Sequence, residues 1–161
     1  MAVILNAFSQ MIMNSYEATL AVMPQLAGFI PMLTGTGGNC GSQSSTLVIR
    51  GLAIGEIEFR DLFKVIWKEV RIAVCISIIL AVVNGTRILI MGQGDAMMAF
   101  TIGVTMACTV IIAKVVGCTL PLVAKKVGLD PAIMATPLIS TLVDISTISV
   151  YFAIVSFVFR L

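Results

Sequence analysis

Long stretches of this sequence contain no charged residue. Three such gaps lie between Glu17 and Arg50, between Asp95 and Lys114, and between Asp144 and Arg160. A helix needs about 20 mostly apolar residues to cross the hydrocarbon core of a bilayer, and these gaps reach or approach that length. Only 11% of the 161 residues are charged, whereas a soluble domain usually carries about 25%. The sequence therefore predicts an all-α membrane protein.

Five hydrophobic segments can be separated along the chain, and we expect each to form a transmembrane helix. They cover residues 2–16, 18–49, 72–91, 96–123 and 131–159. The first is short for a full span, which suggests a truncated helix with residues missing before Met1. In the connection from Arg50 to Arg71, the segment FRDLFKVIWKEVR is predicted to form an amphipathic helix on the membrane surface.

The basic residues indicate an orientation in the membrane. The connections after the second and fourth segments hold seven of the ten Lys and Arg residues. The positive-inside rule places both connections in the cytoplasm. The N-terminus would then be cytoplasmic and the C-terminus external, in a cell (inner) membrane. The basic residues form no long run with interleaved aromatic residues, so we expect no nucleic-acid partner.

Asp144 is the first candidate for an ion ligand, because it lies about midway through the fifth segment. A carboxylate at that depth costs about 2.5–3.5 kcal/mol on insertion scales and usually faces a water-filled cavity or a partner charge. Thr136 and Ser140 precede Asp144 at intervals of four residues, and Thr147 follows three residues later. One face of the helix would therefore carry oxygen ligands.

Two neighbouring features bear on this site. Pro137 would leave the carbonyl of Ile133 without its helical donor and so add another oxygen. Lys114, inside the fourth segment, offers the structural alternative of an ion pair with Asp144. Snorkelling of Lys114 to the interface and exposure to a water-filled vestibule are the other readings of this residue.

The glycine-rich stretch from Pro31 to Ser45, PMLTGTGGNCGSQSS, is the second candidate region. Each glycine costs up to about 1 kcal/mol in a helix interior, so we expect an interrupted helix. Irregular backbone at membrane depth persists only where protein buries it or where it lines a cavity. The alternative is that the glycines allow helices to pack closely. The residues that we expect to line an ion path here are Gly38, Asn39, Gln43 and Thr46.

The available ligands indicate the kind of ion. The chain has no histidine, and its four cysteines are not clustered, which argues against zinc, copper or iron. Carboxylate, hydroxyl and carbonyl oxygens suit hard cations such as Mg²⁺ or Ca²⁺. Two copies of Asp144 at a two-fold axis would balance a divalent charge, so we expect a homodimer. With one mid-membrane carboxylate and no acid/base pair, an enzyme is not expected.

Several motifs occur in an informative order. They are PMLTGTGGNCGSQ (residues 31–43), RGLA (50–53), DPA (130–132) and PLISTLVD (137–144). Together they resemble the transmembrane domain of MgtE-type Mg²⁺ transporters over almost the whole chain. The resemblance implies five helices per subunit and a pore at the homodimer interface, lined by the second and fifth helices. It also implies that Asp144 holds a hydrated Mg²⁺, with Ser140 and Thr136 alongside.

The sequence departs from this family pattern in three places. Thr136 stands where some members have Asn, and Lys114 stands where a neutral residue is expected. The cytoplasmic N-terminal and CBS regulatory domains typical of the family are absent from residues 1–161, so we interpret the whole chain as an MgtE-like transmembrane domain.

Three functional hypotheses follow. The leading one is a channel-like transporter that moves hydrated Mg²⁺ down its electrochemical gradient, with Mn²⁺, Co²⁺ and Ca²⁺ as other candidate ions. A cation-coupled exchanger, for example Na⁺ against Mg²⁺, is the alternative that an interrupted second segment would favour. A purely structural membrane subunit is the third, and it predicts that Asp144→Asn alters assembly but not ion flux.

Overall fold

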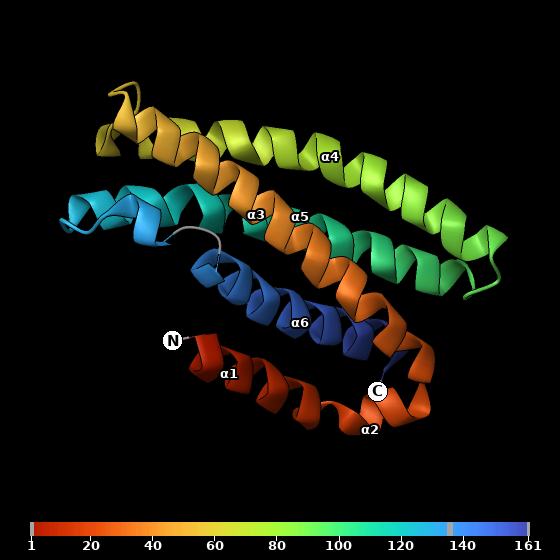
Figure 1. The fold of residues 1–161 in the computed structure, drawn as a ribbon. Coiled ribbons are helices and arrows are strands. Elements are labelled where there is room, and N and C mark those ends of the chain that lie inside the picture. The colour runs from red at the N-terminus through yellow and green to blue at the C-terminus, as the bar shows by residue number, and fades with distance from the viewer. Residues whose placement is uncertain (1, 135–136, 161) are drawn as a thin grey trace.

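The molecule is a bundle of long helices, shown in Figure 1 as a computed structural model. The structure describes residues 2–134 and 137–160. In chain order the elements are α1 (Ala2–Ser15), α2 (Glu17–Val22), the 3₁₀ helix η1 (Pro24–Phe29), α3 (Ile30–Ala53), η2 (Phe59–Asp61), α4 (Leu62–Ile90), α5 (Ala96–Lys126), η3 (Pro131–Met134) and α6 (Pro137–Phe159). These two ranges contain no β-strand, which confirms the predicted all-α class.

Three helical segments are long and apolar enough to cross a membrane. They are Phe59–Ile90, Ala96–Lys126 and Pro137–Phe159, and they fit an integral membrane protein. The 14 residues of α1 span about 21 Å at 1.5 Å per residue, which is less than the ~30 Å hydrocarbon core. Along the chain, α1, α3, α4, α5 and α6 run in alternating directions (Figure 1). A count of five membrane spans stays a prediction.

The helices pack around α5 and α6. Helix α4 lies along α5, α3 crosses both α5 and α6, and α1 lies against α6 (Figure 1). Aromatic residues hold the start of the chain on α6. The hydroxyl of Tyr151 donates to the carbonyl of Leu26 at 2.9 Å, and the rings of Tyr16 and Phe152 stack with centroids 4.4 Å apart. Helix α6 is therefore covered by both α1 and the segment that leads into α3.

The glycine-rich stretch is helical, so the predicted interruption is wrong. Helix α3 runs from Ile30 to Ala53 and so continues through all four glycines of this stretch. A Cβ on Gly37 would lie 2.8 Å from Thr109 Cγ2 of α5 and 2.8 Å from Val143 Cγ1 of α6. A Cβ on Gly117 of α5 would overlap the carbonyl group of Gly41. The close approach of the helices that these glycines allow offsets their unfavourable helix propensity, as the packing alternative predicted.

Two further expectations need correction. The predicted surface helix is not a separate element. Its residues form η2 and the first turns of α4, and α4 then continues without a break to Ile90. Leu62 and Ile66 pack there against a core formed by Val48, Leu52, Cys118 and Leu122, while Phe63 and Trp67 stay exposed. Pro137 begins α6, where its missing N–H breaks no helical hydrogen bond. It therefore does not free the carbonyl of Ile133 in the predicted way.

Candidate ion site

Asp144 is the eighth of the 23 residues of α6 and is half-buried. Ser140, one turn earlier, is also half-buried, whereas Thr147 is buried against Gly37. Thr136 lies outside the described residues. Asp144 takes part in none of the ion pairs found in residues 2–134 and 137–160, which join Arg60 to Glu58, Lys64 to Asp61 and Lys114 to Glu69. Its charge is therefore not neutralised by a side chain in these ranges.

The exposed side of α3 is polar. Asn39, Gln43 and Thr46, which we call the polar face of α3, are all exposed and line a shallow open groove on α3 together with Ser42 and Leu47. The Thr46 hydroxyl donates to the carbonyl of Ser42 at 2.9 Å. An exposed amide is costly against lipid, so this face suits water or another protein surface better than lipid.

Gly38 connects the polar face of α3 to α6. It is half-buried, and a Cβ at Gly38 would lie 3.7 Å from the Ser140 hydroxyl oxygen. The fold thus brings Gly38 and Ser140 together, as the sequence suggested, and leaves the Asn39 and Gln43 side chains on the adjoining exposed side of α3. Asp144 is not among the residues that line the groove. Among the described residues, the predicted site residues are therefore divided between the outer side of α3 and half-buried positions of α6.

Lys114 is paired with Glu69, so an ion pair between Lys114 and Asp144 is ruled out. The Lys114 ammonium lies 2.9 Å from Glu69 Oε2 and donates to the Ser44 hydroxyl oxygen at 3.0 Å. Ser44 donates in turn to Glu69 Oε2 at 2.6 Å. Lys114 is only 4% exposed and Glu69 only 5%, so Lys114 neither snorkels nor faces a vestibule. We call these three residues the buried charge cluster.

Sequence reasoning missed Glu69 as a buried residue, although a signal was present. Glu69 follows Leu62, Val65 and Ile66 at helical spacing and precedes Ala73, so it lies on the apolar stripe of its helix. A carboxylate on such a stripe needs a partner. The segment that contains Glu69 was instead predicted to form an amphipathic helix on the membrane surface.

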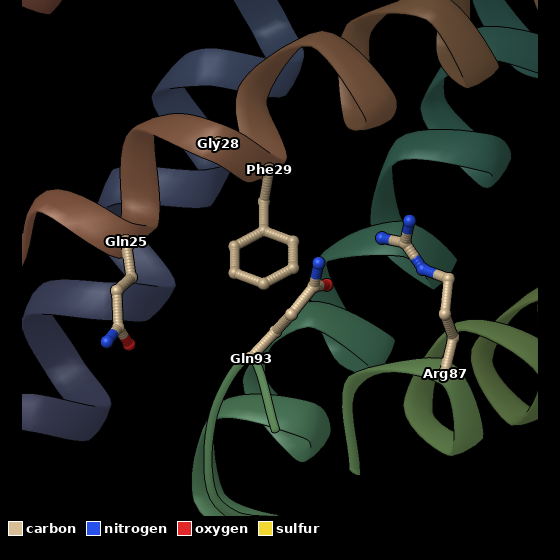
Figure 2. Close-up of a pocket in the computed structure, with 5 residues that line it drawn as sticks. All are labelled: Gln25, Gly28, Phe29, Arg87 and Gln93. Atoms are coloured by element: carbon tan, nitrogen blue, oxygen red, sulfur yellow. The ribbon is translucent and has the colours of Figure 1, made fainter. Parts of the chain in front are cut away.

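A separate pocket lies at the other end of the bundle from the basic connections. Figure 2 shows Gln25, Gly28 and Phe29 of η1, together with Arg87 of α4 and Gln93 of the following turn, around this pocket. None of the predicted site residues lines it. The only charge among its lining residues is the guanidinium of Arg87, which would repel a divalent cation. We therefore do not assign the ion site to this pocket.

The donor set of the candidate site fits a hydrated hard cation. Residues 2–134 and 137–160 contain no group of three Asp, Glu or Cys side chains placed to hold a metal, and the chain has no His. One copy therefore offers one carboxylate, hydroxyls and amides. Mg²⁺ keeps several of its waters and is often bound through one or two carboxylates, so a sparse set of this kind is compatible with it.

Comparisons with known proteins agree with this donor chemistry. The MgtE family, described as divalent cation transporters, matches residues 30–154. The chain is 34% identical over 154 residues to the magnesium transporter MgtE of Bacillus subtilis, and 32% identical over 143 and 152 residues to those of Thermus thermophilus and Enterococcus faecalis. These alignments cover 89–93% of this chain but only 31–33% of each relative, so the chain spans about a third of their length.

Proposed function

The chain belongs to the MgtE family of divalent cation transporters, and we propose that it forms a homodimeric channel that conducts hydrated Mg²⁺ down its electrochemical gradient. The observation that carries this proposal is the half-buried Asp144, which has no ion-pair partner among the described residues and lies on a helix long and apolar enough to cross a membrane. A charge in that position is usually functional. The relatives are magnesium transporters by name, which supports Mg²⁺ as the ion. Mn²⁺, Co²⁺ and Ca²⁺ are the competing candidates, since the same oxygen ligands suit them.

The path that we propose runs between two copies of the chain. A single Asp144 supplies one negative charge, and two copies related by a two-fold axis would supply two against the +2 of the ion. The polar face of α3 is exposed in the single chain. A second copy facing it across a layer of water would shield its amides from lipid. Asn39, Gln43, Thr46 and Ser140 would then bind the waters of the ion rather than the ion itself.

The interior of one subunit is a poor route by comparison. The ammonium of Lys114 lies buried among α3, α4 and α5. Because Glu69 lies 2.9 Å from this ammonium and balances its charge, the cluster offers a cation no net attraction and leaves no free carboxylate to bind it. The continuous α3 also removes the broken helix that had favoured a coupled exchanger. We therefore favour a channel over a coupled exchanger.

The remaining parts of the proposal concern the orientation in the membrane and the identity of the domain. The connections that carry most of the basic residues lie at one end of the bundle, where Lys125 of α5 donates to the carbonyl of Leu52 at the end of α3 at 3.0 Å. By the positive-inside rule we assign that end, and the N-terminus, to the cytoplasmic side of the inner membrane. We interpret residues 1–161 as an MgtE-like transmembrane domain.

The test is Mg²⁺ influx into proteoliposomes that contain a Mg²⁺-sensitive dye, under an imposed membrane potential. We expect native flux to follow the potential without any counter-ion gradient, and Asp144→Asn to lower it by about tenfold or more, because the carboxylate that attracts the ion is lost. Glu56→Gln, which removes one charge from an exposed connection, is the matched control and should conduct normally.

Other outcomes separate the rival functions. Flux that requires an opposing Na⁺ gradient would favour the exchanger. Equal flux in the native protein and in Asp144→Asn would remove Asp144 from the path. The structural subunit would be favoured if the native protein carries no flux and Asp144→Asn changes its assembly.

A further inference from the structure

The buried charge cluster joins the three helices that carry it by direct hydrogen bonds. Ser44 is on α3, Glu69 on α4 and Lys114 on α5, and each side chain contacts the other two at 2.6–3.0 Å. Ser44 is fully buried. A triangle of this kind is satisfied only when all three helices hold one rotation and one depth, because hydrogen bonds weaken steeply with poor distance or angle.

Stability alone does not explain the cluster. A buried ion pair gains little over apolar side chains of similar volume, because the cost of removing both charges from water offsets their attraction. Such a pair can instead select one arrangement among several of similar packing energy. The contact of α3 with α5 and α6 is one where a single arrangement has to be selected.

The contact in question is the seam between α3 and its neighbours. On α3 it is formed by Gly37 and Gly41, which face Thr109 and Ala113 of α5 and Ile139 and Val143 of α6. A glycine surface allows close approach but presents no side chain to interlock, so it defines helix rotation weakly. The cluster lies beside this seam, since Ser44 is one turn after Gly41 and Lys114 is one turn before Gly117.

The rotation of α3 decides where its polar face points. Gln43 is exposed and Ser44, the next residue, is buried, so the two side chains are about 100° apart around the helix. Fixing Ser44 on Glu69 and Lys114 therefore also fixes the directions of Gln43 and Asn39.

We propose that Lys114 and Glu69 are positioning residues that act through Ser44 to orient the polar face of α3 in the ion path. They do not contact the ion. This inference rests on the proposed function for its effect on flux, but the orientation itself can be measured separately.

The test compares three proteins in a background without the native cysteines, each with Gln43→Cys as a reporter. The first keeps the native pair, the second is Lys114→Met/Glu69→Met, and the third is the exchanged pair Lys114→Glu/Glu69→Lys. The rate at which a membrane-impermeant maleimide modifies position 43 is measured in proteoliposomes. Glu56→Cys, in the exposed connection, is the control position for reagent access and should react equally in all three.

We expect the doubly apolar variant to assemble with a melting temperature no lower than that of the native pair. The modification rate at position 43 should nevertheless change, and with Gln43 intact the Mg²⁺ flux should fall by about tenfold because the polar groups are misplaced. The exchanged pair should restore both values toward those of the native pair. A merely structural role would not give a folded variant with altered access and flux.

The inference is overturned if the doubly apolar variant folds and shows the native modification rate at position 43. If that variant does not assemble, the exchanged pair is the deciding variant. An exchanged pair that does not keep the native modification rate and the native flux would contradict positioning by these residues. If the native protein carries no Mg²⁺ flux at all, the proposed function fails, whereas the modification rates still report the orientation of α3.

Discussion

The two sides of α3 carry polar groups under opposite conditions. On the buried side, Ser44 meets Glu69 and Lys114 in a cluster in which each charge has its partner. On the exposed side, Asn39 and Gln43 are open, and Asp144 of the adjoining α6 has no ion-pair partner among the described residues.

This contrast separates groups that hold the fold from groups that are free to meet a ligand. A paired buried charge has its electrostatic needs met inside the protein and is costly to disturb. An unneutralised charge at a half-buried position can still attract an ion. Both carboxylates, Glu69 and Asp144, lie in helices long and apolar enough to cross a membrane, so their surroundings rather than their depth assign their roles.

The largest expected effect comes from exchanging each carboxylate for its amide. Glu69→Gln leaves the Lys114 ammonium buried without a counter-charge, and breaking a buried pair in this way costs about 3–5 kcal/mol. Asp144→Asn removes a charge that has no partner to lose, so the free energy of unfolding should stay equal or rise. Thermal denaturation in detergent, followed by size-exclusion chromatography, measures both.

The comparison fails if the two variants lose the same stability. That result would mean that Asp144 holds the fold as Glu69 does, and the assignment of Asp144 to the ion path would lose its main support. A stable Glu69→Gln protein would instead show that the buried charge cluster is not needed to fix the helices.

A smaller effect is expected at the glycine seam on the buried side of α3. Gly117→Ala would place a methyl group onto the carbonyl of Gly41 and push α5 away from α3, at a cost of about 1–3 kcal/mol for overpacking. Gly85→Ala on α4 is the matched control, because a Cβ there meets nothing within 4 Å. It should raise stability by up to about 1 kcal/mol through better helix propensity. The same denaturation assay distinguishes them, and equal midpoints would contradict the seam.

Features that depend on local sequence were predicted well. Three of the five predicted segments, residues 72–91, 96–123 and 131–159, overlap the helices that are long and apolar enough to cross a membrane. The depth of Asp144 in its segment marked it as the candidate ligand. Asn39, Gln43 and Thr46 are exposed, and their place along an ion path stays a prediction.

Features that depend on distant partners were not predictable from local patterns. Glu69 and Lys114 are 45 residues apart in sequence, and no periodicity links them. The glycines of α3 suggested a break because helix propensity describes an isolated helix. Thr109, Ala113 and Val143, on other helices, reverse that conclusion by packing against them. Tertiary contacts decided both cases.

An effect of similar size is expected at Ser44 when two serines on opposite sides of α3 are compared. Ser44→Ala removes a hydroxyl that both accepts from Lys114 and donates to Glu69 but leaves the ion pair in place, so the loss should be about 1.5–3 kcal/mol for hydrogen bonds to charged groups. Ser42→Ala, two residues earlier and half-buried beside the groove, should change stability by no more than about 0.5 kcal/mol. Denaturation midpoints of the two variants, measured together, decide the matter: a larger loss for Ser42→Ala would place the structural contacts of α3 on its exposed side and reverse the contrast between its two faces.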